Sequence, residues 1–110
     1  MRTASGRMKM LDIPSSTVGA ISELAVACFL LKKGYEVYRP LSPSCSGDLL
    51  IEKNSKFIKI EVRSGYRHLI TGKVYFSIKN VRAETMAVVI QRTEEILFFK
   101  YPSKEVFEFK

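Results

Sequence analysis

The first regular pattern in the chain is helical and runs from Ser15 to Lys33. Its apolar residues recur every three or four positions, at Val18, Ile21, Leu24, Ala25, Cys28, Phe29 and Leu31. A serine or threonine at its start can cap the helix, and Gly34 supplies the left-handed residue that ends it. Residues 1–14 are polar, basic and without period, so we predict a loosely ordered basic N-terminal arm there.

Apolar runs after Gly34 predict a series of strands. The first three are YEVYRP, DLLIE and FIKIEVR, and Asn54 and Ser55 turn the chain between the last two to make a hairpin. KVYFSI, MAVVI and ILFFKY follow, KNVRAET can hold a short helix, and the tail SKEVFEFK fits either a helical turn or a strand. One helix followed by several strands predicts a single α/β domain over residues 15–110, with a small mixed central sheet flanked by helices.

Two carboxylates interrupt the apolar runs of the predicted hairpin. Asp48 stands at the front of DLLIE, and Glu61 lies in FIKIEVR on the same face as Lys59 and Arg63. A carboxylate at the edge of a packed strand loses hydration, so it needs a metal ion or a basic partner. Two simpler interpretations stay open, because Asp48 can be a turn residue after Gly47 and Glu61 can pair with Lys59 or Arg63.

Composition limits the partners of the chain. Its 18 Lys and Arg residues against 11 Asp and Glu give a net charge of +7. This excess suits a phosphate-rich partner, although an ordinary basic surface has the same composition. No continuous apolar run approaches the ~20 residues of a membrane span, and Met1 to Met10 lack the apolar core of a signal peptide. We therefore expect an intracellular, cytoplasmic chain without a membrane partner. Cys28 and Cys45 suggest neither a disulfide framework nor a metal clip.

Three segments of the chain place acidic residues within or beside apolar runs. They are GAISELAVACFLLKKGYEVYRP with Glu23, SGDLLIE with Asp48, and IKIEVRSG with Glu61, Val62 and Arg63. They resemble the helix Glu, the motif Asp and the Glu-x-Lys half of the PD-(D/E)XK nucleases, in the Holliday-junction-resolvase-like branch. The resemblance covers residues 16 to 65. It implies a restriction-endonuclease-like core and an endonuclease that acts on DNA with Mg²⁺ or Mn²⁺.

The chemistry of phosphodiester hydrolysis explains why these residue types occur together. A divalent ion neutralises charge on the phosphate and makes water a usable nucleophile, and Mg²⁺ prefers hard oxygen ligands. Asp48 and Glu61, side by side on a hairpin, can supply two of them. The resemblance adds the backbone carbonyl of Val62 as a ligand, and Glu23 as a helix-borne acid that holds a water or a second ion. Without the family pattern, Glu23 is an ordinary solvated helix residue.

Arg63 departs from the pattern, because this position holds Lys in the family. Arg keeps its proton in proteins, so it can bind the phosphate or stabilise charge but cannot accept a proton. Work as a general base then falls to hydroxide on the metal, to a second acid, or to a neighbour such as Lys59, Tyr66 or His68. The expected catalytic set is Glu23, Asp48, Glu61 and Arg63.

Other residues are candidates for contacts with the nucleic acid. Arg39 follows the first strand and lies at the same end as Asp48 if the two strands pair in parallel. The loop RPLSPSCSGD resembles the serine-rich loop of archaeal resolvases, with Ser42 ahead of Ser44 and Ser46 as the candidate, or it is a flexible linker. Further along, basic residues stand among aromatic ones that can equally be core, at Arg67, His68, Lys73, Lys79 and Arg82.

Three functions remain after these observations. The favoured one is a Mg²⁺-dependent endonuclease on DNA, acting as a homodimer because two symmetric cuts need two sites. The strands VYFSI and ILFFKY, expected as apolar edge strands of the sheet, are candidates for the dimer interface. The second is a nucleic-acid-binding module of the same fold with weak or no cleavage, which Arg63 favours. The third is a structural domain that binds protein.

Overall fold

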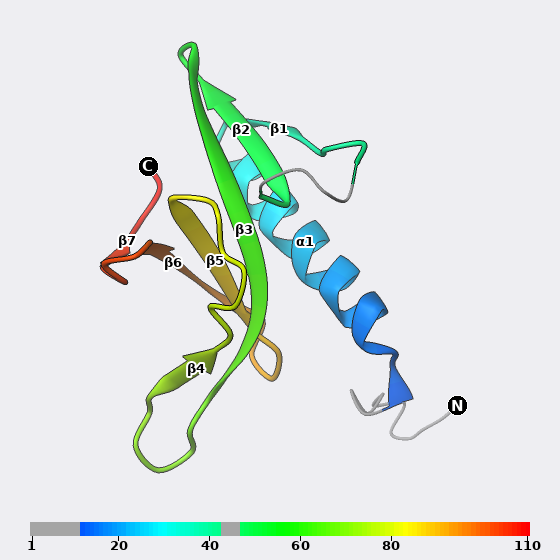
Figure 1. Ribbon diagram of the computed structural model, residues 1–110, viewed down its shortest axis with the longest axis vertical. Coiled ribbons are helices and arrows are strands. Elements are labelled where there is room, and N and C mark those ends of the chain that lie inside the picture. The colour runs from blue at the N-terminus through cyan, green and yellow to red at the C-terminus, as the bar shows by residue number, and fades with distance from the viewer. Residues whose placement is uncertain (1–11, 43–46) are drawn as a thin grey trace.

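The computed structural model describes residues 12–42 and 47–110, which form one helix and a seven-stranded mixed sheet (Figure 1). The sheet order is β1-β2-β3-β5-β6-β7, with β4 paired to β3; β3 and β5 are parallel and the other neighbours antiparallel. The elements are α1 Ser15–Lys32, β1 Glu36–Tyr38, β2 Leu49–Lys53, β3 Lys56–Arg67, β4 Val74–Phe76, β5 Thr85–Ile90, β6 Glu95–Lys100 and β7 Val106–Phe107. The predicted α/β fold with a mixed sheet is confirmed.

The long strand β3 organises the sheet, because its two edges have different partners. On one edge, residues 60–65 pair in parallel with β5. On the other edge, residues 56–60 pair with β2 and residues 65–67 pair with β4, and Figure 1 shows these two strands toward opposite ends of β3. Within the described part of the chain, residues 61–64 therefore have a strand partner on the β5 edge alone.

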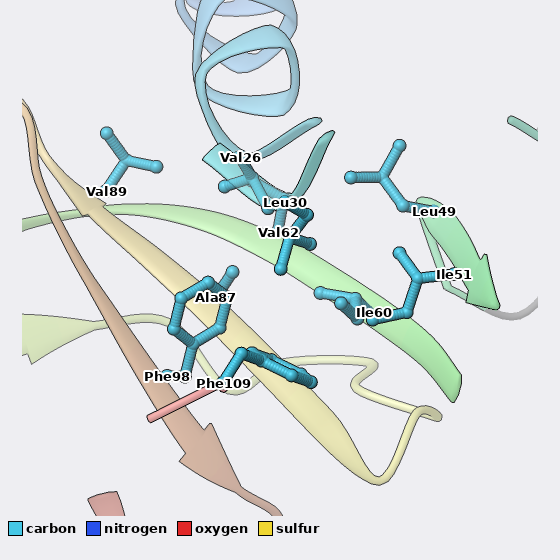
Figure 2. Close-up of a cluster of buried hydrophobic side chains, with 10 residues drawn as sticks. All are labelled: Val26, Leu30, Leu49, Ile51, Ile60, Val62, Ala87, Val89, Phe98 and Phe109. Carbon is cyan, nitrogen blue, oxygen red and sulfur yellow. The ribbon is translucent and has the colours of Figure 1, made fainter. Parts of the chain in front are cut away.

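The main core lies between α1 and the sheet. Val26 and Leu30, four positions apart on one helix face, are fully buried, and Figure 2 shows them above Val62 and Ile60 of β3. The cluster also contains Leu49, Ile51, Ala87, Val89, Phe98 and Phe109. Ile60 and Val62 thus form the apolar face of β3, as the period of two in the sequence predicts.

A second cluster covers the opposite face of the sheet. It consists of Met86, Val88 and Ile90 of β5 and Phe99 of β6. Every residue of β5 is buried, and this explains why its sequence TMAVVI is a nearly continuous apolar run. In the register, Glu61 lies opposite Met86, so Glu61 belongs to the face away from α1.

The elements agree with the sequence except at the start of α1, where Pro14 is the N-cap and no serine or threonine side chain caps the helix, and after β4. The helix, the hairpin and the strands β5 and β6 are confirmed, Asn54 and Ser55 turn with positive φ, and the undecided tail forms β7. The short helix expected in KNVRAET is wrong, because this segment turns and Asn80 adopts a left-handed φ of 61°. Strand β6 is not an edge strand as expected, because β7 pairs with its outer side.

Helix α1 is long and apolar enough to cross a membrane by length and composition alone, a test that core helices of soluble proteins also pass. The absence of a long uninterrupted apolar run is therefore weaker evidence against a membrane than the sequence suggested. The packing of Val26 and Leu30 against the sheet accounts for part of the apolar character of the helix.

Gly65 and Gly19 provide a matched test of the packing around β3. A Cβ at Gly65 would lie 2.7 Å from Val88 Cγ1 and 2.8 Å from the carbonyl oxygen of Tyr75, whereas a Cβ at Gly19 of α1 meets nothing within 4 Å. Gly65→Ala should lower the free energy of unfolding by about 1–3 kcal/mol. Gly19→Ala should raise it by up to about 1 kcal/mol, because Ala has the better helix propensity. Urea unfolding measures both, and equal effects of the two changes would contradict the close approach of β4 and β5 at Gly65.

Candidate active site

Asp48 lies against the edge of β3 that faces away from β5, beside residues 61–64. The backbone N–H of Asp48 donates to the carbonyl of Ile60 at 2.8 Å, as the last link between β2 and β3. One step further, the N–H of Val62 donates to Oδ2 of Asp48 at 2.8 Å. The side chain of Asp48 thus takes the place of a strand partner at Val62, and this fixes its carboxylate beside Glu61.

The guanidinium of Arg63 lies among the oxygens of this edge. Its Nη1 donates to Oε2 of Glu61 at 2.6 Å and to the carbonyl of Val62 at 3.2 Å, and it lies 3.9 Å from Oδ2 of Asp48. The Arg63 and Glu61 side chains are only 20% and 12% exposed, so water screens this ion pair little. Arg63 is one of the two partners that the sequence suggested for Glu61.

A loop holds the guanidinium from its other side. Nη2 of Arg63 donates to the backbone carbonyl of Lys79 at 2.9 Å. Lys79 belongs to the turn between β4 and β5 where the sequence predicted a helix. The two ends of the planar group are therefore held by different parts of the chain, the strand edge and the loop.

The donor atoms around Arg63 suit a hard divalent cation. Asp48 and Glu61 offer carboxylate oxygens and Val62 a carbonyl oxygen, which are ligand types that Mg²⁺ and Mn²⁺ prefer. Nη1 of Arg63 contacts or approaches all three, so it stands in for a cation among them. Among residues 12–42 and 47–110, no three His, Cys, Asp or Glu side chains are grouped as a metal site. The ligand set fits only when the Val62 carbonyl is included and Arg63 yields its place.

Glu23 reaches the site from α1, together with Arg39. Oε1 of Glu23 lies 3.5 Å from Nη2 of Arg39, and these two residues line a pocket with Ser42 and Asp48. Arg39 and Asp48 lie at the same end of the strand pair, as expected, but the pairing is different. Strands β1 and β2 are antiparallel, so the end of β1 lies next to the start of β2. The expectation of parallel pairing was wrong. Ser44 and Ser46 lie outside the described residues.

The carboxylates of the site affect each other's ionisation. The pKa of Asp48 is raised, chiefly because burial disfavours its charged form and further by the charge of Glu61, against the opposing effects of the Val62 N–H and Arg63. The pKa of Glu23 is also raised, first by burial and then by the charge of Asp48, while Arg39 lowers it. The site is therefore a place where negative charge is in excess and held close together.

A partly buried polar cluster that the sequence did not suggest fixes α1 against β3. The hydroxyls of Ser22 and Ser64 lie 2.9 Å apart, and Nε2 of Gln91 donates to Oγ of Ser22 at 3.0 Å. Ser22 is 1% exposed and precedes Glu23, and Ser64 follows Arg63. A signal was present, since Ser22 is the polar member of the buried stripe that continues with Val26 and Leu30.

The structure does not bring Arg67 and His68 to the carboxylates Asp48 and Glu61. Arg67 donates to both carboxylate oxygens of Glu95, at 2.9 and 3.0 Å, and to the carbonyl of Gly72. Nδ1 of His68 accepts the N–H groups of Ile70 and Thr71, so this ring stabilises the β3–β4 turn. These bonds give both side chains a structural role.

The other basic candidates lie on the surface. Lys73, Lys79 and Arg82 are exposed, and the backbone of Lys79 reaches Arg63. Tyr66 and Tyr75 stack on each other across β3 and β4 with ring centroids 5.3 Å apart and are exposed, so they are not core residues. Contact of these basic and aromatic residues with nucleic acid stays a prediction.

The raised pKa of Asp48 predicts a pH-dependent effect of Asp48→Asn in metal-free buffer. A carboxyl whose pKa is raised by folding binds its proton more tightly in the folded state. Its contribution to stability is therefore present below its unfolded pKa and is lost as the pH rises through its folded pKa. Relative to the wild type, the variant should gain free energy of unfolding between about pH 4 and about pH 7. Urea unfolding at both pH values measures this, and a relative loss with rising pH would contradict it.

Glu61→Gln is the matched control for that experiment. The change is equally isosteric, but it removes the partner that Arg63 holds at 2.6 Å. The guanidinium is then left without its closest anion, so the free energy of unfolding at neutral pH should fall by on the order of 3 kcal/mol. Identical behaviour of the two variants would show that Arg63 does not distinguish Glu61 from Asp48.

The chain is similar to known proteins in both sequence and fold. A segment of 46 residues is 41% identical to Protein 5.3 of Escherichia phage T7, over 42% of this chain and 39% of that protein. The fold is similar to that of the bacterial homing endonuclease I-Ssp6803I, with a TM-score of 0.67 and 21% identity, over 78% of this chain and 64% of the other. This chain thus spans less than two thirds of the length of the phage protein and of the homing endonuclease. The family profile described as PD-(D/E)XK endonuclease matches residues 14–105, and the chain therefore belongs to this family.

Proposed function

We propose that the chain is a metal-dependent endonuclease that hydrolyses DNA at the edge of β3. The observation that carries this proposal is the convergence of Asp48, Glu61 and the Val62 carbonyl on one cationic group. Membership of the PD-(D/E)XK endonuclease family and a fold similar to that of a homing endonuclease support it. The metal would be Mg²⁺ or Mn²⁺, held by these three residues.

Each residue of the site has a separate task in this proposal. A divalent ion bound there supplies stabilisation of charge on the phosphate and acidifies water. Asp48 is held in place by the Val62 N–H, so it is preorganised as an anionic ligand. Glu23, on the other side of the pocket, has a raised pKa and is suited to accept a proton from the attacking water. Arg63 binds a non-bridging oxygen of the phosphate and stabilises its charge.

The finer proposal is that the substrate is a branched DNA junction and the active form a homodimer. It rests on the resemblance of the Glu23 helix and the serine-rich loop to those of junction resolvases. Two symmetric cuts need two sites. Of the two strands expected at the dimer interface, β4 pairs with β3 alone among the described strands, whereas β6 is covered by β7, so β4 is the remaining candidate.

A second candidate function is a DNA-binding module that does not cleave. The ion pair of Arg63 with Glu61 favours it, because a guanidinium at this place satisfies the carboxylates without a metal. Arg63→Lys separates the two functions. In an active enzyme it should keep or raise the rate of cleavage, whereas an inactive wild type could at most gain a trace of cutting.

Cleavage of supercoiled plasmid and of a labelled four-way junction is expected with Mg²⁺ or Mn²⁺. Asp48→Asn and Glu61→Gln should each lower the rate at least about a hundred-fold, because each removes a charged ligand. Nicking and linearisation on gels measure the rate. Symmetric cuts in the junction and none in the plain duplex would support the finer proposal. Cutting that survives Glu61→Gln would show a contaminating nuclease or another active site.

DNA binding without metal is expected to fall steeply with salt. Exposed basic side chains such as Arg82 contact phosphates in this proposal, and each such contact releases about one counterion. Arg82→Gln should reduce the slope of log affinity against log salt by about one. Arg67→Gln is the matched control and should change the slope less, because Glu95 already neutralises Arg67. Gel shifts in EDTA measure both, and an absence of binding at low salt would remove DNA as a partner.

A further inference from the structure

Arg63 and a divalent ion cannot use the same oxygens at the same time. Nη1 of Arg63 lies 2.6 Å from Glu61, 3.2 Å from the Val62 carbonyl and 3.9 Å from Asp48. These are all three ligands of the proposed metal. An ion within the usual 2.0–2.6 Å of these oxygens would lie against Nη1, and two cations in contact repel each other strongly where water is excluded.

We propose that Arg63 is an internal counter-cation that competes with the divalent ion for Asp48, Glu61 and the Val62 carbonyl. This inference rests on the proposed metal site. Without metal, the guanidinium neutralises the carboxylates and keeps them together. When a metal ion binds, Nη1 must give up its contacts with these oxygens. Part of the binding free energy of the metal is therefore used to displace the guanidinium.

The residue type makes the competition permanent. A lysine could leave such a site by losing its proton, but a guanidinium keeps its charge at every physiological pH. Arg63 therefore has to move, and the bond from Nη2 to the Lys79 carbonyl gives it a second point of attachment away from the carboxylates.

The phosphate of bound DNA is the natural new partner of the displaced guanidinium. Arginine pairs with phosphate through two parallel hydrogen bonds, which are among the stronger ones in proteins. DNA that attracts Arg63 frees the carboxylates for the metal, and metal that displaces Arg63 frees it for DNA. Binding of the two is thereby coupled, in equal measure in both directions.

Metal titration of Arg63→Gln tests the competition without any measurement of cleavage. Isothermal titration with Mn²⁺ should give at least a ten-fold tighter dissociation constant for the variant than for the wild type. Arg92→Gln is the control, because it removes the same charge from an exposed residue of the β5–β6 turn and should change the constant less than two-fold. Arg63→Lys, which keeps a charge and is safer for folding, should fall between the wild type and Arg63→Gln.

The outcomes separate this inference from the proposed function. Equal affinities of the wild type, Arg63→Gln and Arg63→Lys would overturn the competition and leave the metal site standing. A gain in Arg92→Gln as large as in Arg63→Gln would also overturn it, since net charge would then explain the effect. No binding by any of these proteins, each shown to be folded by circular dichroism, would overturn the competition and the metal site together.

The coupling to DNA is measured by the same titration with Ca²⁺, which takes the same oxygen ligands, with and without a short duplex. Direct contact between phosphate and ion tightens metal binding equally in the wild type and in Arg63→Gln. The DNA-induced tightening should therefore be at least five-fold larger in the wild type, and the excess belongs to Arg63. The same tightening in both proteins would overturn the coupling.

Discussion

The excess of negative charge at the unpaired edge of β3 is the constraint on which the site depends. Asp48, Glu61 and the Val62 carbonyl lie together where no strand from residues 12–42 or 47–110 covers the edge, and they need a positive charge between them. Partial burial makes this need greater, since water screens the repulsion less. In this structure Arg63 meets the need, so one side chain both stabilises the folded edge and determines what a metal ion must displace.

The fold creates this edge through the parallel pairing of β3 with β5. A parallel neighbour requires a crossover, and the segment from β4 to β5 that makes it passes the site and presents the Lys79 carbonyl to Arg63. On the other edge, pairing with β2 ends at residue 60 of β3 and pairing with β4 begins at residue 65, so residues 61–64 between them carry the site. Ser22, Ser64 and Gln91 then fix α1, and with it Glu23, against the same strand.

The predictable part of this structure is the part that local patterns encode. The helical period predicted α1, but its buried face is Ser22, Val26 and Leu30, whereas Ile21, Leu24 and Leu31 of the predicted apolar stripe are exposed. The period of two placed Ile60 and Val62 in the core with Glu61 on the other face. The position of Arg39 beside Asp48 was predicted with the wrong strand direction, because strand pairing depends on tertiary contacts. The bond from Arg63 to the Lys79 carbonyl and the bond from Gln91 to Ser22 join residues far apart in sequence. No local sequence pattern predicts such bonds.

The same contacts limit which residue can accept a proton from the attacking water in the proposed reaction. Arg63 cannot accept it, Nδ1 of His68 is engaged in the β3–β4 turn, and the ring of Tyr66 stacks on Tyr75. Glu23 differs from these, because burial and the charge of Asp48 raise its pKa while Arg39, at 3.5 Å, limits the rise. A carboxylate made more basic suits a general base, and the Ser22 cluster fixes the helix that carries it. In the proposed enzyme, the departure from lysine at position 63 would therefore shift proton transfer toward the helix and leave the strand edge to bind charge.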